Sequence, residues 1–222
     1  MTIIAVVGLK HEAKIVAGPN IQAIIGGSRT SDLGKAIKLA ARGDTNGVIS
    51  IGIAGALAPE LKHCDVVLAS EIVIDDERVS TDPLWLSSIH ARLSSATVGA
   101  IAGSDVVVAS TLWKKALHRD TAALAVDTES HIAAIAARDL ALPFAVMRVI
   151  SDTADRALPP ATLCAVRPDG GVSLGAVMRS VLLNPLQIPS LIQTAHDANA
   201  AFATLLRCRN LLGPRLGFPN LG

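Results

Sequence analysis

The chain has 222 residues, a length that suits one α/β domain with a buried core. Half of the residues are hydrophobic but only 2% are aromatic, so Ala, Val, Leu and Ile must form most of that core. The formal net charge is +1 and the Lys and Arg residues are scattered, so the sequence indicates no nucleic-acid partner.

Cysteine usage points to a reducing compartment. Cys64, Cys164 and Cys208 are odd in number, far apart and without a CxxC or Cys/His spacing. We therefore expect reduced thiols, a cytoplasmic location and no zinc or other metal site. Residues 2–8 are too short for the core of a signal peptide, and the absence of any run of 18 apolar residues predicts no membrane span.

The N-terminal half alternates apolar stretches with segments of helical spacing. Leu33, Ile37 and Ala40 fall on one face of a helix that Ser31 or Asp32 can cap. The unbroken apolar run 48–54 suits a strand covered on both faces. The predicted strands are 2–8, 21–26, 48–54, 65–74 and 97–102, and the predicted helices are 11–17 and 31–42.

The C-terminal half continues the alternation and ends in helices. We predict strands over 124–126 and 144–150, and helices over 129–142, 172–183 and 186–212. Residues 156–171 contain three prolines and two glycines and are expected to form a loop that borders the site. Residues 213–222 lack periodicity, so we expect them to be disordered or docked on a partner subunit.

Strands that alternate with helices predict an α/β fold. The expected architecture is a three-layer α/β/α arrangement around a central mixed, mostly parallel sheet. No repeat and no domain linker interrupts the pattern. We therefore predict a single domain over 1–212, followed by the tail 213–222.

Carboxylates follow two neighbouring strands of this predicted sheet. Glu129 and Asp127 come at the end of strand 124–126, and Asp152 comes at the end of strand 144–150. The carboxyl ends of strands face the ligand crevice of an α/β sheet. Glu129 is either a first-turn helix acid or a carboxylate that accepts hydrogen bonds from a vicinal diol. Asp127 points the same way if the backbone is extended, and one of the two acids is then structural.

Two further acids have both a structural and a catalytic interpretation. Asp152 can cap a turn with Ser151, or it can be a general acid that protonates a leaving group. Glu12 follows the first strand, where it is either a first-turn helix acid or a general base for water.

Two glycine-containing turns are candidate ligand contacts. Residues 50–57 run from a strand into small residues. Such a segment is either a tight bend that needs glycine or a place where a ligand approaches Ala54 and Gly55 closely, and the pattern alone somewhat favours the bend. Residues 26–29 precede a predicted helix. There Gly27 and Arg29 either hold an anion such as phosphate or form a glycine turn with a solvated arginine.

Taken together, these motifs resemble the superfamily of purine nucleoside phosphorylases and methylthioadenosine/S-adenosylhomocysteine nucleosidases. Residues 51–67, IGIAGALAPELKHCDVV, are similar to the nucleosidases' GSAGGLAPxLKxGDIV stretch. Residues 126–130, VDTES, resemble VEMEA, and residues 143–155, PFAVMRVISDTAD, resemble PFxxxRxISDxAD. The resemblance covers about residues 1–156 in the same order. It implies the nucleoside phosphorylase-like fold and cleavage of an N-glycosidic bond.

Within that superfamily, residues 127–131 (DTESH) and 151–160 (SDTADRALPP) look closest to the hopanoid-associated phosphorylase branch. That resemblance implies release of adenine from adenosylhopane in hopanoid biosynthesis. It assigns no redox or metal cofactor.

Residue roles follow from the same resemblance. Glu129 is expected to bind the ribose 2′- and 3′-hydroxyls, and Asp152 to protonate or hydrogen-bond purine N7 with Ser151 beside it. Ala54 and Gly55 are expected near the sugar and the nucleophile. Phe144 is expected to begin the strand that leads into the base pocket, and it is otherwise a core residue. Thr128 replaces the family's usual Met beneath the ribose.

The resemblance leaves the nucleophile open. In an ungapped alignment Glu12 falls one residue before the nucleosidases' water-activating glutamate, and Ala13 takes the matching position. Phosphorolysis would instead need an anion site, for which Gly27 and Arg29 are the candidates and inorganic phosphate the co-substrate.

Two alternatives to the hopanoid function stay open. One is a methylthioadenosine/S-adenosylhomocysteine or general purine nucleosidase, which a small closed pocket would favour over a large apolar cleft. The other is a non-catalytic nucleoside- or lipid-binding protein, which would bind ligand without turnover. The resemblance also implies a homodimer. We further hypothesise that the tail or the 156–171 loop contacts a membrane surface as a peripheral, membrane-associated element.

Overall fold

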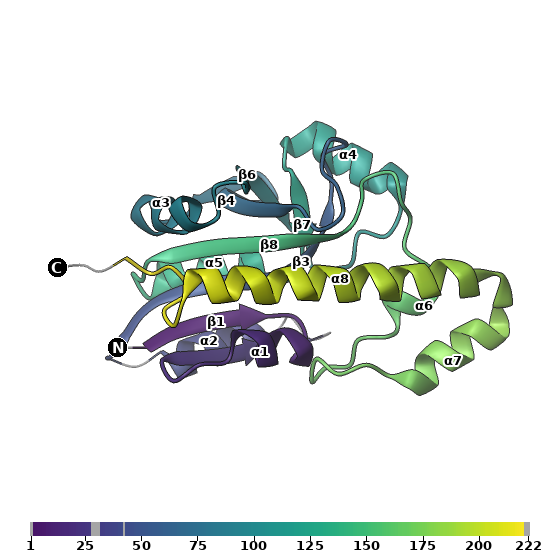
Figure 1. Cartoon of the computed structure of the whole chain (residues 1–222), viewed down its shortest axis with the longest axis horizontal. Helices are drawn as coiled ribbons and strands as arrows, with labels where there is room; N and C mark the ends of the chain where they lie inside the picture. The colour runs from purple at the N-terminus through teal and green to yellow at the C-terminus, as the bar shows by residue number, and fades with distance from the viewer. Residues whose placement is uncertain (1, 28–31, 42, 220–222) are drawn as a thin grey trace.

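The computed structural model describes residues 2–27, 32–41 and 43–219. One sheet runs through the molecule and helices cover it (Figure 1). The strands are β1 Thr2–Val7, β2 Ile21–Ile25, β3 Thr45–Ala56, β4 Val66–Ile74, β5 Glu77–Ser80, β6 Thr97–Gly103, β7 Ala125–Asp127 and β8 Phe144–Asp152. The helices are α1 Lys10–Val16, α2 Leu33–Ala40, α3 Pro83–Arg92, α4 Thr111–Thr121, α5 Ser130–Asp139, α6 Pro160–Leu163, α7 Leu174–Leu183 and α8 Ile188–Leu212, with a 3₁₀ turn, η2, at Pro185–Gln187.

The sheet is mixed and mostly parallel, as the sequence predicts. Strand β1 pairs in parallel with β2 and β3, β3 with β8, and β6 with β4 and β7. Three pairings are antiparallel: β3 with β7, β4 with β5, and β4 with β8. The pairings from β3 through β8, β4, β6 and β7 return to β3, so part of the sheet closes on itself.

Side chains of β1 show how the two faces of the sheet are covered. Ile4 and Val6 point to one face, where they join a cluster that includes residues of α2 and α5. Ile3, Ala5 and Val7 point to the other face and join residues of α1, α3 and α8. The alternation along the strand therefore produces two cores, one on each side of the sheet. The three-layer prediction is confirmed.

Several elements differ from those predicted. Strand β5 and helices α3, α4 and α6 were not expected, and α6 lies inside the predicted 156–171 loop. Helix α5 ends at Asp139 rather than residue 142, because Ala141 has a positive φ of 52°. Helix α2 begins at Leu33 without a side-chain cap from Asp32, and Ser31 lies outside the described residues.

The tail prediction is wrong for residues 213–219. Leu216 and Phe218 are buried in the core of the same chain. The Trp85 indole N–H donates to the Leu216 carbonyl at 3.0 Å, and the Phe218 ring meets the Trp85 ring edge-on at 4.8 Å between centroids. This segment is therefore an ordered part of the domain that closes the end of α8 against α3.

The cysteines and the helices bear on two further expectations. Cys64, Cys164 and Cys208 form no disulfide. Within the described ranges, no helix combines the length and the apolar character that crossing a membrane requires.

Candidate active site

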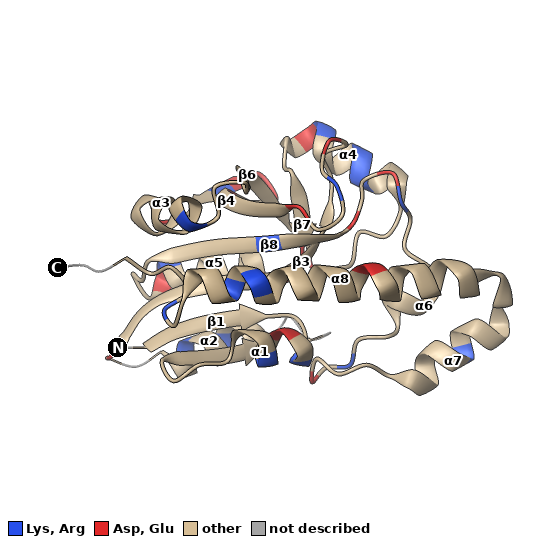
Figure 2. Cartoon of the chain, in the orientation of Figure 1, with Lys and Arg blue, Asp and Glu red and all other residues tan. Residues whose placement is uncertain are grey.

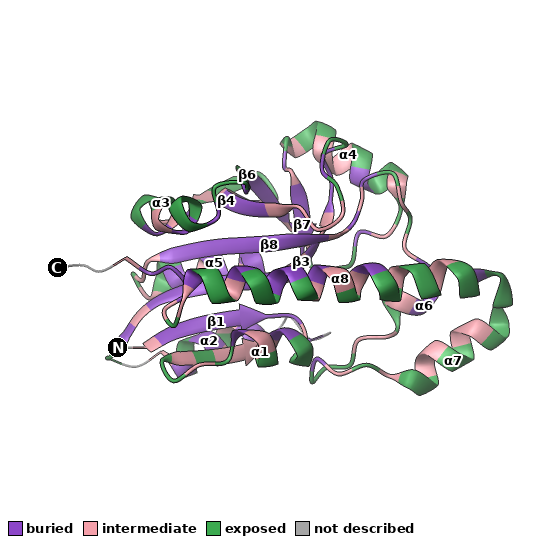
Figure 3. Cartoon of the chain, in the orientation of Figure 1, coloured by how far each residue is buried: buried purple, intermediate pink, exposed green. Residues whose placement is uncertain are grey.

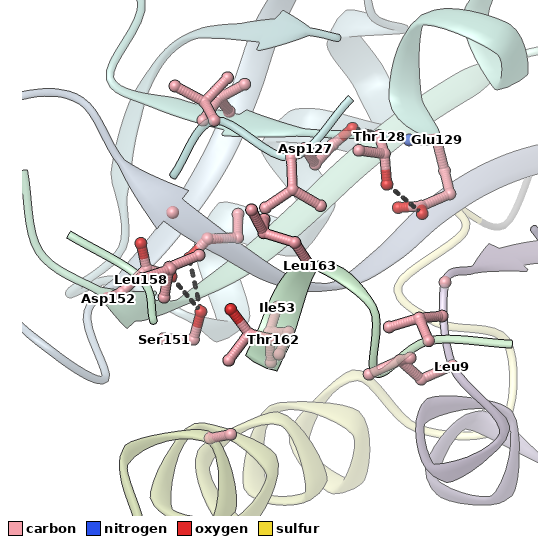
Figure 4. Close-up of a pocket in the computed structure, with 18 of the residues that line it drawn as sticks. Leu9, Ile53, Asp127, Thr128, Glu129, Ser151, Asp152, Leu158, Thr162 and Leu163 are labelled. Carbon is pink, nitrogen blue, oxygen red and sulfur yellow. Dashed lines mark hydrogen bonds between the residues drawn. The ribbon is translucent and has the colours of Figure 1, made fainter. Parts of the chain in front are cut away.

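A cavity of about 560 Å³ opens at the carboxyl ends of β1, β3, β7 and β8. The last residues of β3, β7 and β8, and the residues that follow β1 and β7, form its floor, and the segments 105–108 and 158–166 form its sides. This is the edge at which open α/β sheets bind ligands. Figure 4 shows that Glu129 and Thr128 lie on one side of the cavity and Asp152 and Ser151 on the other.

The cavity brings together eight of the ten residues that the sequence singled out. They are Glu12, Gly27, Ala54, Gly55, Thr128, Glu129, Ser151 and Asp152. Arg29, the other phosphate candidate, lies outside the described residues. Phe144 is the first residue of β8, at the opposite end of the strand from Asp152, and packs in the core. We therefore withdraw Phe144 as a substrate-binding residue.

Glu12 is buried against the backbone of two strand ends. Its Oε2 accepts hydrogen bonds from the Gly8 and Leu9 N–H groups, and its Oε1 accepts one from the Ile53 N–H, each at 2.8 Å. Ala13, the residue that the ungapped alignment favours, packs into the core instead. The geometry thus places Glu12, not Ala13, on the cavity.

Asp127 and Arg148 form the buried frame under Glu129. Asp127 Oδ1 accepts from the Glu129 and Ser130 N–H groups and so caps α5, while its Oδ2 accepts from Arg148 Nε at 2.6 Å. Arg148 is fully buried, and its Nη2 lies 3.5 Å from Glu129 Oε2. Of the two acids at this strand end, Asp127 is therefore the structural one.

Glu129 has an unusual protonation equilibrium for a glutamate. Burial raises its pKa to about 7, and the nearby charges of Asp127 and Glu12 raise it as well, while Arg148 and the Thr128 hydroxyl oppose the shift. Burial also raises the pKa of Glu12, against the opposing effects of Arg148 and the three backbone N–H groups. Three carboxylates share one guanidinium here, so at neutral pH this cluster holds a proton or excess negative charge.

Thr128 has a role that its position in the motif did not reveal. Its hydroxyl donates to Glu129 Oε1 at 2.5 Å. Thr128 therefore orients the carboxylate of Glu129, the residue that the resemblance assigns to the ribose hydroxyls.

Glycines leave room for the carboxylates themselves. A Cβ atom at Gly8 would lie 2.8 Å from Glu129 Oε1, and one at Gly52 would lie 2.3 Å from Glu12 Oε1. A Cβ atom at Gly55 would lie 3.0 Å from Asp152 Oδ2. The glycines after β1 and within β3 therefore accommodate the site's own acids, a reason beyond the turn geometry and ligand approach considered from sequence.

Asp152 is paired with a lysine that sequence reasoning missed. Lys114 on α4 is fully buried, and its Nζ donates to Asp152 Oδ2 at 2.5 Å and to the carbonyls of Thr153 and Arg156. Ser151 Oγ donates to Asp152 Oδ1 at 2.8 Å. Lys114 lies three residues before Leu117, on the inward face of α4. A lysine on such a face implies a buried acidic partner, and this was the available signal.

Arg156, in the segment that follows β8, also has an acidic partner from a distant part of the chain. It pairs with Asp197 on α8. This pair and the Lys114 contact to the Arg156 carbonyl fix the segment that leaves β8, so the segment that follows Asp152 is tied to both α4 and α8.

The predicted anion cradle is not formed by the backbone of Gly27. Its N–H donates to the Gly8 carbonyl at 3.0 Å, and the neighbouring Gly26 N–H donates to the Val7 carbonyl. A Cβ atom at Gly27 would lie 2.3 Å from the Pro168 carbonyl oxygen, so the glycine allows the 167–168 backbone to approach. The prediction that Gly27 donates to phosphate is therefore wrong for its backbone N–H.

The charge of the cavity is one-sided. Among the described residues that line it there is no Lys, Arg or His. The charged lining residues are the acids Glu12, Asp105, Asp127, Glu129 and Asp152. In the described part of the chain, no group of three or more His, Cys, Asp or Glu side chains is arranged to hold a metal ion. The site can accept hydrogen bonds and protons, and it disfavours an anionic ligand.

The remaining wall is apolar. Val106, Val107 and Val108 line one part, and Leu158, Leu163 and Val166 line another, together with Leu9 and Ala198. The cavity thus joins a polar, acidic floor to an apolar rim.

The sequence profile of the phosphorylase superfamily matches residues 15–166 of this chain. That range includes Glu129, Asp152 and Lys114 but begins three residues after Glu12. No curated protein matches the chain.

Solved structures show the same fold. A 5′-methylthioadenosine/S-adenosylhomocysteine nucleosidase of Helicobacter pylori superposes with a TM-score of 0.66 at 17% identity, covering 95% of this chain and 97% of its own. An S-adenosylhomocysteine nucleosidase of Streptococcus pyogenes, in complex with 5-methylthiotubericidin, superposes with a TM-score of 0.61 at 19% identity over 89% and 96%. A putative 5′-methylthioadenosine/S-adenosylhomocysteine nucleosidase of Francisella philomiragia superposes with a TM-score of 0.63 at 18% identity, covering 95% of this chain and 99% of its own.

Proposed function

Because the chain belongs to the phosphorylase superfamily, we propose that this enzyme uses water to cleave the N-glycosidic bond of a 5′-substituted adenosine. The observation that carries the proposal is the arrangement of Glu12, Glu129 and Asp152. These acids come from α1, the end of β7 and the end of β8, and they line one cavity. Their surroundings differ in the way that such a reaction requires.

Glu129 and Glu12 form the sugar side of the proposed site. Ionised Glu129 accepts hydrogen bonds from the ribose 2′- and 3′-hydroxyls, with Thr128 and Arg148 holding its carboxylate. Positive charge develops on the ribose as the glycosidic bond breaks, and a cluster of three carboxylates with one guanidinium stabilises that charge. Glu12 takes a proton from the attacking water, and its raised pKa suits a general base near neutral pH.

Asp152 forms the base side of the proposed site. Negative charge develops on the departing adenine, and it is neutralised by a proton at N7. Lys114 Nζ donates to one oxygen of the Asp152 carboxylate, and the Ser151 hydroxyl donates to the other. We propose that this pair supplies the proton to N7 through Asp152, while Glu12 gains the proton that water loses.

The acidic lining favours water over phosphate as the nucleophile. A phosphate dianion next to Glu12 and Glu129 would meet negative charge without a described Lys or Arg on the cavity wall. The N–H groups of Gly26 and Gly27 are already used by carbonyls of residues 7 and 8. Phosphorolysis would therefore depend on Arg29 alone.

The apolar rim supports a large apolar 5′ substituent. A volume of about 560 Å³ is within the range of pockets that hold drug-sized ligands. Val107, Leu163 and Val166 offer an apolar path away from the acidic floor. We therefore propose adenosylhopane as the substrate, with adenine as the released product. Methylthioadenosine is the second candidate, because the H. pylori structure of this fold is named for that substrate.

We also propose a homodimer. Val106, Leu112 and Trp113 form an exposed apolar group on the segment beside the cavity, which a second copy would cover. Size-exclusion chromatography with light scattering checks this, and a monomer at micromolar concentration would contradict it.

The test of the proposed function is adenine release, measured by liquid chromatography and mass spectrometry from adenosylhopane and from methylthioadenosine, with and without phosphate. We expect release without phosphate and a free ribosyl product. A ribose 1-phosphate product that requires phosphate would establish phosphorolysis and make Arg29 the next residue to change.

Two variants serve as controls for the assigned roles. Asp152→Asn and Glu129→Gln should each lower kcat/KM by about 10² or more while the protein stays folded. Nucleoside binding without turnover in the wild type, with binding retained in Asp152→Asn, would instead support a non-catalytic binding protein.

A further inference from the structure

An exposed apolar arm lies beside the cavity. We define the apolar arm as residues 172–192, which comprise α7, η2 and the first turn of α8 with the residues that join them. In Figure 1 the apolar arm projects beyond the sheet, and in Figure 3 α7 is drawn in the colours of exposed and intermediate residues. No residue of α7 is buried. Exposed apolar side chains on the arm include Leu174, Met178, Leu182, Leu183, Leu186 and Ile192.

The apolar side chains are arranged as a helix surface rather than scattered. Leu174, Met178 and Leu182 are spaced by four residues, so they form one stripe along α7. Leu183 points away from that stripe, and Leu186 follows at the turn into α8. The apolar surface therefore wraps around the end of the apolar arm, which suits immersion in a fluid better than contact with a flat protein face.

The charge of the arm distinguishes lipid from a protein partner. Between Asp169 and His196 the only charged residue is Arg179 (Figure 2). A protein interface normally has a polar rim, often charged, around its apolar centre. On the apolar arm the exposed polar side chains are few and include Arg179 and Asn184. An anionic bilayer surface meets no carboxylate here and one guanidinium, so insertion is not opposed by charge repulsion.

The apolar arm is joined to the cavity wall through Gln187. This buried side chain accepts from the Ala161 N–H at 2.9 Å and donates from Nε2 to the Ser180 carbonyl at 2.8 Å. It therefore ties α6 to α7. Thr162 and Leu163 of α6 line the cavity, and Figure 4 places both of them beside its acidic floor. An apolar chain that leaves the cavity along α6 would reach the arm.

We propose that the apolar arm inserts into the surface of a lipid bilayer and holds the mouth of the cavity against it. The role of docking in catalysis rests on the proposed function, with its lipid-linked substrate. Membrane binding itself is tested without that substrate. Of the two sequence-based candidates for membrane contact, the tail and the 156–171 loop, the tail contributes Leu216 and Phe218 to the core.

The test is co-sedimentation with vesicles of phosphatidylcholine, alone and with phosphatidylglycerol. We expect the wild type to bind both. Leu182→Gln/Leu186→Gln, at sites 81% and 89% exposed, should lower the partition coefficient by at least about tenfold. Leu39→Gln/Leu84→Gln, at sites 83% and 61% exposed on α2 and α3, is the matched control and should bind like the wild type.

Three results would overturn the proposal. The first is that the wild type binds neither vesicle, and the second is that the arm variant binds as strongly as the wild type. The third is that the arm variant differs from the wild type in molar mass by light scattering, which would show that a second copy covers the arm. Adenine release from soluble methylthioadenosine is measured on the same proteins and should be equal in all three. Vesicle binding by a protein that cleaves no nucleoside would disprove the proposed function alone, and cleavage without vesicle binding would disprove the docking alone.

Discussion

Both ends of the cavity carry buried acidic side chains, but the positive charge that accompanies them differs. At the proposed sugar end, Glu12, Asp127 and Glu129 share the guanidinium of Arg148, and burial raises the pKa of Glu129 to about 7. At the proposed base end, Asp152 pairs with Lys114, whose Nζ lies 2.5 Å from Asp152 Oδ2. The first cluster has an excess of negative charge, and the second is balanced.

This difference matches the charges that form when an N-glycosidic bond breaks. The sugar becomes positive and needs surrounding negative charge, while the base becomes negative and needs a proton. Residue type alone would not distinguish Glu129 from Asp152, since both are buried acids at strand ends. Their partners, which come from distant parts of the chain, assign them different tasks.

The largest effect is expected from Glu12→Gln, which removes the proposed base from the sugar end. The amide cannot accept a proton from water, so kcat/KM should fall by about 10³ with methylthioadenosine or adenosylhopane as substrate. Thermal unfolding should show that the variant is folded. A kcat/KM within a few fold of the wild-type value would show that Glu12 is not the general base.

The next effect is expected from Lys114→Met at the base end. The change leaves Asp152 buried without its cation, so we expect a loss of about 3 kcal/mol in the free energy of unfolding and a fall of about 10² in kcat/KM. Urea unfolding and steady-state kinetics measure the two. Lys115→Met, at the exposed neighbouring position, is the matched control and should change neither. Equal behaviour of the two variants would show that the charge balance at Asp152 is unimportant.

A smaller effect is expected from Gly52→Ala. The new Cβ atom would lie 2.3 Å from Glu12 Oε1 and 2.7 Å from Arg148 Nη1, both of them buried. We expect a loss of about 1–3 kcal/mol in stability and about a tenfold fall in kcat/KM, because Glu12 must leave its three N–H donors. Gly43→Ala, where no atom lies within 4 Å of the added Cβ, is the control. A fully active Gly52→Ala protein would mean that the position of Glu12 is not critical.

The smallest effect is expected from Thr128→Val, which changes the surroundings of Glu129 without removing an acid. The variant lacks the hydroxyl that donates to Glu129 and lowers its pKa, so that pKa should rise by about one unit. At pH 6 kcat/KM should be several fold lower than in the wild type, and at pH 9 the two should be equal. The same ratio at both pH values would show that the hydroxyl acts by packing alone.

The strands other than β5, and the acids at the ends of β7 and β8, were predictable because they depend on local pattern. Glu129 and Asp152 follow apolar runs, and the alternation of strands and helices leads directly to a mixed sheet. Helix α3 was missed although Asp82 and Pro83 form a typical helix start, with Asp82 accepting from the Trp85 N–H.

The partners of the acids were not predictable because they come from distant segments. Lys114 lies 38 positions from Asp152, and the Ile53 N–H lies 41 positions from Glu12. The Glu12 contact depends on the pairing of β1 with β3, and the Lys114 contact depends on α4 lying against the end of β8. No local pattern encodes either arrangement. The tail was misjudged for the same reason, since Phe218 is ordered by its contact with Trp85.

The most direct test of the account is the pH dependence of kcat/KM for wild-type enzyme between pH 5 and 9 with a soluble nucleoside. Glu129 must be ionised to accept the ribose hydroxyls and Glu12 must be ionised to take a proton. Both pKa values are raised, so activity is low below them and appears as pH rises. The account predicts a rising limb with an apparent pKa of about 7. A profile that is already flat at pH 5.5 would show that the sugar-side carboxylates ionise as ordinary surface acids and would contradict it.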